Sequence, residues 1–178
     1  MAARIEYRTL PVPAFAEHTV QIAAGAVTFG VEYRHLDEDT ILAFFGTDSR
    51  EKFDNVRPAG MAEVVEEDGL SLHVFATATG EEILRFDCFD DAPHYHLLDA
   101  GRVRNIVIEH DPGDGPLLDW ALPRLRDELP RLLADAGAGA LARDVDPSAL
   151  EPALLAVAQT AQYVLAAGRP VRVPQASN

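Results

Sequence analysis

The stretch LSLHVFATATGEEILRFDC, residues 70–88, decides the fold class of this chain. Apolar and polar side chains alternate on both sides of the Thr-Gly pair at 79–80, which is the period of a strand with one buried face. Two strands joined by so short a turn must be antiparallel, because a parallel pair needs a crossover of about a dozen residues. The alternation puts Cys88 on the same face as Leu84 and Phe86, so we expect its thiol to lie in the core.

Similar patterns recur over residues 1–110. Short turn signals at Ala24-Gly25, Asp68-Gly69 and Ala100-Gly101 predict further hairpins. The predicted strands are 18–23, 26–34, 41–46, 61–67, 70–77, 82–88, 94–98 and 103–109. We therefore expect about eight or nine strands in one bent antiparallel sheet, arranged as a sandwich or an open barrel.

The pattern changes to helical spacing after residue 110. Leucines recur at helical intervals up to Gly137, with Pro123 and Pro130 predicting a kink or a break. A second helix is predicted from Asp146, which precedes a proline, to Gly168. This last helix is apolar around much of its circumference, so we expect the sheet to cover one side and the first helix or a second subunit to cover another.

The sequence thus predicts an α+β protein with a β domain at 1–110 and two C-terminal helices at 111–178 packed on it as one structural domain. A length of 178 residues with 48% hydrophobic and 25% charged side chains fits one folded domain. The chain shows no apolar run of roughly 18 residues and no signal-peptide pattern, which predicts a cytoplasmic location. With one cysteine, an intrachain disulfide is excluded.

The net charge of −14 argues against two classes of partner. Nucleic acids and anionic membranes both attract basic surfaces, and the basic residues of this chain are scattered among acidic ones. We therefore expect neither nucleic acid nor membrane as a partner. A small-molecule ligand and a homodimer partner remain compatible with the sequence.

The candidate site is the segment RFDCFDDAPHYH, residues 85–96. His94 and His96 are separated by one residue, so an extended backbone directs both imidazoles to the same face. Two such histidines and one carboxylate can bind a divalent metal ion. The third ligand could come from Asp90, Asp91, Asp99 or His73, and we select Asp91 for the predicted metal set.

Two other interpretations of the same residues stay open. Either histidine could act as a general base with Asp90 or Asp91, while Tyr95 or Arg85 polarises a substrate oxygen. Alternatively, the histidines only form hydrogen bonds with neighbouring aspartates. The residues alone do not decide whether the site is catalytic, or whether it holds a metal.

A small-molecule pocket in the curved sheet is the first functional hypothesis. Arg85 and His73 would form part of its polar wall, and the long segment 47–60 would serve as a lid. Basic side chains of this segment that could contact an anionic ligand are Arg50, Lys52 and Arg57. The alternative hypothesis is a non-catalytic domain that dimerises or binds another protein through the apolar C-terminal helix.

Several known motifs are absent from the sequence. It contains no glycine-rich nucleotide loop, no Gly-x-Ser-x-Gly and no His-Glu-x-x-His. The cupin metal signature also fails, because Cys88 stands where that signature has glycine and Asp99 follows His96 too closely. No family chemistry is therefore transferred to the two histidines.

Overall fold

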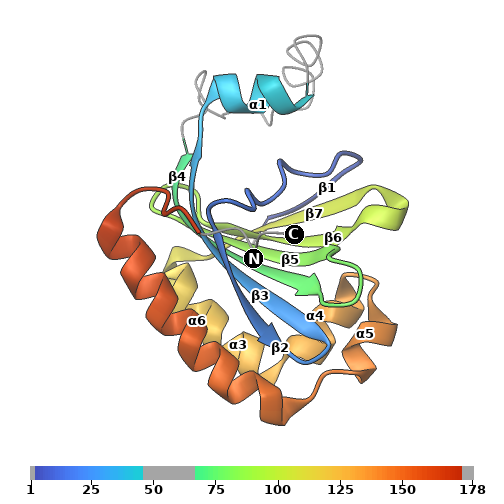
Figure 1. Cartoon of the computed structure of the whole chain (residues 1–178). Helices are drawn as coiled ribbons and strands as arrows, with labels where there is room; N and C mark the ends of the chain where they lie inside the picture. Colours follow the sequence, from blue (N-terminus) through green and yellow to red (C-terminus); the bar gives the residue numbers. More distant parts are fainter. Residues whose placement is uncertain (1–2, 46–66, 174–178) are drawn as a thin grey trace.

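The computed structural model describes residues 3–45 and 67–173, which form one antiparallel sheet with helices packed on it (Figure 1). The strands are β1 (Arg4–Tyr7), β2 (Thr19–Ala24), β3 (Val27–Leu36), β4 (Glu67–Ala76), β5 (Glu82–Phe89), β6 (His94–Asp99) and β7 (Arg104–Glu109). The α-helices are α1 (Glu38–Phe45), α3 (Leu117–Asp127), α4 (Leu129–Asp135), α5 (Gly139–Arg143) and α6 (Pro147–Ala167). Short 3-10 helices occupy Ala100–Arg102 and Pro112–Asp114. The predicted α+β class is confirmed.

The sheet has the order β1-β7-β6-β5-β4-β3-β2, and every neighbouring pair is antiparallel. The described residues therefore contain seven strands in a single sheet, not about eight or nine in a sandwich or open barrel. The expected hairpins at Gly25 and Gly80 are confirmed, and both glycines have the positive φ that such turns favour. The turn at Ala100 is a short 3-10 helix between β6 and β7.

The predicted hairpin turn at Asp68-Gly69 is wrong. Both residues lie inside β4, where Asp68 pairs with His35, and Gly69 pairs with Arg34 on one side and Phe89 on the other. The glycine is needed there for space, because a Cβ at Gly69 would stand 2.9 Å from the Phe89 ring. Pairing with two neighbouring strands outweighs the local turn preference of the Asp-Gly pair. Most of the predicted strand 61–67 lies outside the described residues.

The predicted strand at 41–46 is also wrong, because residues 38–45 form helix α1. Asp37 precedes the helix, and its carboxylate accepts a hydrogen bond of 2.7 Å from the Thr40 amide. Ile41 then packs with Val12 and Leu36 in a small separate core. A short apolar run fits a strand or a helix turn equally well, and the cap decides for the helix.

Among the described residues after 110 there are four α-helices: the predicted break divides the first helical segment into α3 and α4, and α5 was not predicted. α3 and α4 meet at Glu128, just before Pro130, whose ring cannot follow a continuous helix. The boundaries of α6 are confirmed: the Asp146 carboxylate caps its start, and Gly168 ends it with φ 58°. No helix within the described ranges is both long and apolar enough to cross a membrane.

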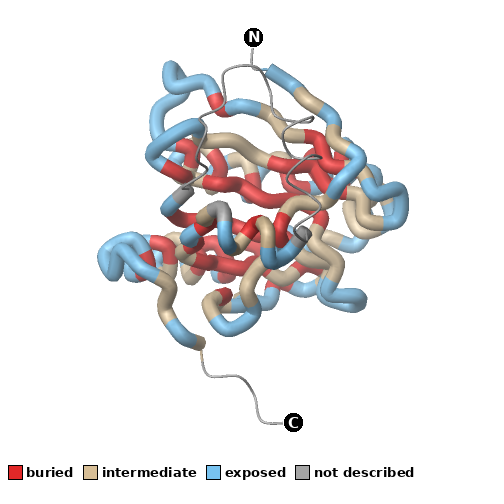
Figure 2. Tube along the Cα trace, turned by 90° about the horizontal axis from the view of Figure 1, so that it is seen from above, coloured by how far each residue is buried: buried red, intermediate tan, exposed pale blue. Residues whose placement is uncertain are grey.

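The hydrophobic core lies between the sheet and the C-terminal helices. α6 packs against β2, β3 and β4, and α3 and α4 contact β5. The alternate positions predicted to face inward do so, and the buried stretches gather in the central strands and the adjoining helices (Figure 2). Core side chains from the strands include Val27, Phe29, Val31, Leu70, Leu72, Val74, Leu84, Phe86, Leu97 and Ile106. This packing leaves the opposite face of the sheet to a different set of side chains.

Residues 8–18, which we call the strap, cross that opposite face (Figure 1). β1 and β2 are the two edges of the sheet, so the connection between them has to cross every other strand. Six strand spacings amount to roughly 29 Å, while eleven extended residues reach about 37 Å. Eleven residues are thus long enough to cross the sheet and still make a turn at 16–18, where the His18 amide donates to the Phe15 carbonyl at 2.9 Å. The prolines at positions 11 and 13 suit the part of the strap before this turn.

Candidate metal centre

Strand register brings the candidate side chains to the face that the strap crosses. On β5 and β6, Asp87 lies directly opposite His94, and Arg85 lies opposite His96. Because directly paired residues share a face and side chains alternate along a strand, all four point to the same side. Ser71 lies opposite Asp87 on β4 and joins them.

Asp87, His94 and His96 form a compact trio. The Asp87 Oδ2 atom lies 3.0 Å from His96 Nε2 and 3.5 Å from His94 Nε2. One ligand atom from each residue lies within 4.8 Å of the other two. Atoms that bind one metal ion at about 2.1 Å are roughly 3 Å apart, so these separations suit a shared ion.

The hydrogen bonds of the two rings determine which nitrogen faces Asp87. His94 Nδ1 lies 2.9 Å from the carbonyl oxygen of Ala92, and His96 Nδ1 lies 2.8 Å from the Asn105 side-chain oxygen. The Ala92 carbonyl only accepts, so His94 Nδ1 donates to it. Each Nε2 faces Asp87 Oδ2, and the ionised carboxylate accepts the 3.0 Å hydrogen bond from His96 Nε2.

Burial acts on the pKa values of His96 and Asp87 in opposite directions. Burial lowers the pKa of His96, although Asp87 pulls that pKa upward, so the ring is neutral at neutral pH. Burial would raise the pKa of Asp87, but its contact with His96 and the charge of Arg85 hold this pKa well below its usual range. One carboxylate and two imidazole Nε2 atoms thus converge, and a cation bound by all three would displace the proton shared by His96 Nε2 and Asp87.

The surroundings of the trio match those of ligands that are held in place. Ser71 Oγ donates to the other oxygen of Asp87, Asn105 orients His96, and the Ala92 carbonyl orients His94. Such outer hydrogen bonds fix the ring tautomer and the position of metal ligands. The side chains of Asp87 and His96 are 5% and 6% exposed and that of His94 is 17% exposed, so the trio is reached from the His94 side.

A buried ionic network lies beside the trio. His73 places Nδ1 2.6 Å from Glu82 Oε1 and Nε2 3.1 Å from Glu32 Oε2. Arg85 donates two hydrogen bonds to the Glu82 carboxylate, at 2.8 and 2.7 Å. Burial acts to lower the pKa of His73, but the two carboxylates outweigh it and raise that pKa. Both ring nitrogens face carboxylate oxygens, which only accept, so the ring donates from both nitrogens as an imidazolium between two glutamates.

A β-bulge places Glu82 in this network. The register of β4 and β5 shifts between Val74 and Phe75, so Glu82 pairs with Phe75 and shares the face of Arg85. Strict alternation along β5 would instead have put Glu82 on the side of Leu84, in the core. Bulges commonly redirect a side chain in this way.

The strap is tied to the same network. Arg34 is completely buried, donates a 3.0 Å hydrogen bond to the Val12 carbonyl and lies 3.6 Å from Glu32. The Phe15 amide donates to Glu32 at 3.2 Å, and the Phe15 ring lies 5.3 Å from the Arg34 guanidinium. The charged side chains of β3 thus hold the strap against the sheet.

Comparison with known proteins gives one positive finding. A family model described as a domain of unknown function, DUF7700, matches residues 21–161. The chain belongs to this family. The DUF7700 match includes the trio of Asp87, His94 and His96 and the whole ionic network, but it begins within β2 and leaves the strap outside. Searches of curated proteins and of solved structures returned no significant match.

The structure brings some of the predicted site residues together and leaves others apart. His94 and His96 meet as predicted, and Arg85 and His73 lie in the neighbouring network. The carboxylate beside the histidines is that of Asp87, whereas the predicted Asp91 and its neighbour Asp90 are exposed in the turn before β6.

Tyr95 is on the other side of the sheet from the two histidines. Its ring stacks on Phe86 at 5.5 Å and lies 5.3 Å from Trp120, so it belongs to the helix-covered core. The predicted ligand contacts Arg50, Lys52 and Arg57, and the predicted lid at 47–60, lie outside the described residues. Cys88 packs against the core as expected, and burial raises the pKa of its thiol.

Sequence reasoning missed Glu32, Ser71, Glu82 and Asn105 as parts of the site. Each stands at an alternate strand position on the polar face or at a bulge. Glu32 has no local signal of its own, because it stands in the polar phase of the alternation with Thr28 and Arg34. No local signal marks the bulge that redirects Glu82.

Proposed function

We propose that this protein binds a divalent transition-metal ion through Asp87, His94 and His96, and that the metal forms part of a small-molecule site on the strap side of the sheet. The observation that carries the proposal is the convergence of two Nε2 atoms on one carboxylate oxygen, with both rings oriented by hydrogen bonds at Nδ1. A donor set of two imidazoles and one carboxylate suits zinc and the later first-row metals better than magnesium or calcium.

Three protein ligands favour a functional site over a purely structural one. Structural zinc sites usually have four protein ligands, whereas sites with three leave coordination positions for water or a substrate. The greater exposure of His94 gives a ligand a side from which to approach. When bound, such a metal supplies Lewis-acid or water-activating chemistry, and the chain's own groups orient the ligands and hold Asp87 ionised.

Calorimetric titration of the metal-free protein with zinc tests the proposal. We expect one ion per chain, and we expect His94→Ala to lower the affinity at least tenfold because it removes a ligand atom. His94 is the preferred variant because its ring is the least buried of the three. His18→Ala is the matched control, since His18 lies at the end of the strap, beside Phe15 and outside the trio.

Circular dichroism in the presence of a chelator checks that both variants are folded. Equal zinc affinity in the His94→Ala variant and the wild type would overturn the proposal. So would a wild-type protein that binds no zinc, cobalt, nickel, manganese or iron(II). Loss of binding in His18→Ala to the same extent would show that the trio is not the site.

A second candidate function is self-association through α6. Residues 152–168 contain no charged side chain, and Leu155 and Tyr163 on the outer face of α6 are 63% and 65% exposed. In a chain of net charge −14, an uncharged surface is where two copies repel each other least. Sedimentation velocity at several protein concentrations measures whether the chain self-associates. A monomer at every concentration would reject this candidate.

A further inference from the structure

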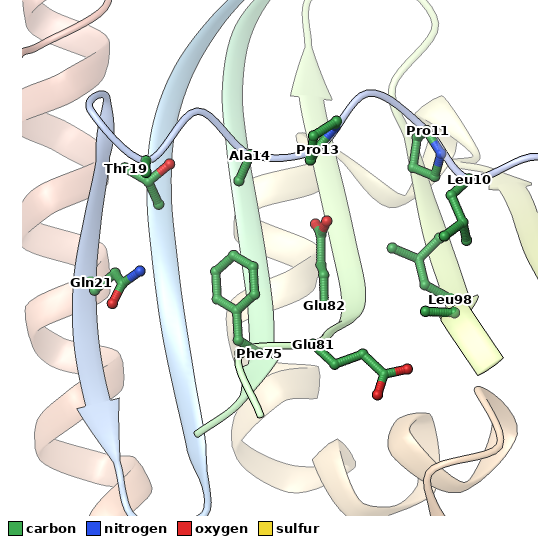
Figure 3. A pocket seen from close by; sticks show the side chains of 13 residues that line it. Leu10, Pro11, Pro13, Ala14, Thr19, Gln21, Phe75, Glu81, Glu82 and Leu98 are labelled. Atoms are coloured by element: carbon green, nitrogen blue, oxygen red, sulfur yellow. The ribbon is translucent and has the colours of Figure 1, made fainter. Parts of the chain in front are cut away.

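A cavity of about 350 Å³ lies between the strap and the sheet (Figure 3). Its roof is the strap, and its floor is formed by side chains from β2, β4, β5 and β6. The volume falls within the range of ordinary small-molecule pockets. Leu98 lines the cavity and lies two residues after His96 on the same face of β6, about 7 Å further along the strand.

The walls of the cavity are mainly apolar. Phe75 projects from the floor toward the strap, with Leu98 on one side and the strap residues Leu10, Pro11 and Pro13 above (Figure 3). The Phe75 ring also stacks on His73 at 5.7 Å, which holds it in position. The body of a bound molecule would therefore be apolar, and a flat ring could pack against Phe75.

The charged lining groups of the cavity are both carboxylates, those of Glu81 and Glu82. Glu82 is neutralised by Arg85 and His73, as described above. Within the described part of the chain, the Glu81 side chain has no hydrogen bond or ion pair with another residue. Glu81 thus gives the cavity an uncompensated negative charge.

The third polar group is the amide of Gln21, which has no side-chain partner among the described residues and lines the cavity beside Thr19. The Thr19 hydroxyl already donates to the Phe15 carbonyl. Basic side chains do not occur in the described lining, so an anionic ligand would meet repulsion without a compensating partner. The lining of the cavity therefore favours a ligand that donates hydrogen bonds and carries a positive charge.

We infer that the strap cavity binds small organic amines with an apolar body, the ammonium group lying at Glu81 and the body against Phe75. An ammonium group brings three donors and a positive charge to the carboxylate. The inference does not require the metal, because none of the trio lines the cavity. Its failure and the failure of the metal proposal are therefore separate outcomes.

The test uses three probes that share one body and differ in the head group: phenethylamine, phenethyl alcohol and hydrocinnamate. Each is titrated into the full-length, chelator-treated protein at neutral pH, and binding is followed by amide chemical shifts in nuclear magnetic resonance spectra. We expect phenethylamine to bind roughly tenfold more tightly than the alcohol and hydrocinnamate not to bind, because one charge-assisted hydrogen bond separates the amine from the alcohol. The shifted amides should be those of the strap and of the β4–β5 turn.

Two substitutions locate the ammonium group. Glu81→Gln keeps the shape and removes the charge, so amine binding should fall to the level of the alcohol. Glu17→Gln, which makes the same charge change on the exposed part of the strap outside the lining, should leave amine binding unchanged. Equal affinity for all three probes, or equal effects of the two substitutions, would overturn the inference.

Ala14→Trp tests the location of the cavity, because the larger side chain fills the space beneath the strap. It should abolish binding of the amine while circular dichroism shows an unchanged fold. Retained binding in a folded Ala14→Trp variant would place the amine elsewhere and overturn the inference. Titration of His94→Ala with phenethylamine should match the wild type.

Discussion

Glu82→Gln should be among the most destabilising single substitutions on the polar face of the sheet. The Glu82 side chain is 13% exposed and neutralises two groups, Arg85 at 2% and His73 at 0% exposure. Glutamine has nearly the same shape, so the change removes charge with little change in packing. Taking one partner from a buried ion pair costs about 3–5 kcal/mol, and the residual hydrogen bonding of glutamine favours the lower end, about 3 kcal/mol.

Urea denaturation followed by circular dichroism measures this loss. With an m-value of about 2 kcal/mol per molar, a loss of 3 kcal/mol lowers the midpoint by about 1.5 M urea. Glu81→Gln is the matched control, since it removes the same charge from the preceding residue, which lies outside the ionic network, and should change stability by less than about 0.5 kcal/mol. If the two variants unfold at the same urea concentration, the network does not hold the sheet together as argued.

Two further predictions concern the same face. The raised pKa of His73 means that its contribution to stability is complete below its ordinary value of 6.5 and is lost as pH rises through the folded-state value. The unfolding free energy should therefore decline on the alkaline side, and a pH series of melts on His73→Gln should lack that decline. Gly30→Ala would place a Cβ 2.8 Å from both Phe75 and Thr19 and should cost about 1–3 kcal/mol in thermal unfolding. Gly101→Ala, whose nearest contact is an ordinary 3.5 Å, should cost less, and an equal cost would contradict the crowding at Gly30.

Much of the fold follows from local patterns. Alternation along 70–88 predicts the hairpin of β4 and β5, and the cap and stop signals at Asp146 and Gly168 predict α6 closely. The errors arise where a local signal competes with a partner distant in the sequence. Asp68-Gly69 has the sequence of a turn, yet both residues pair with β3, and Gly69 also pairs with β5.

The candidate site was predicted in part. The spacing of His94 and His96 directs both rings to one face, and the structure brings them together. The sequence analysis selects Asp91 as the carboxylate ligand, whereas β5 and β6 pair so that Asp87 lies opposite His94. Cross-strand register depends on the length of the intervening turn, which residue types alone do not specify.

Periodicity alone therefore establishes that one face of each strand is apolar, that neighbouring strands run antiparallel and that the C-terminal segment is helical, since these depend on residues close in the chain. Three features depend on contacts between distant segments: the opposition of Asp87 and the histidines, the bulge that redirects Glu82, and the path of the strap over the polar face. Local preferences amount to tenths of a kilocalorie per mole per residue, while pairing with a whole neighbouring strand sums many contacts and decides the register.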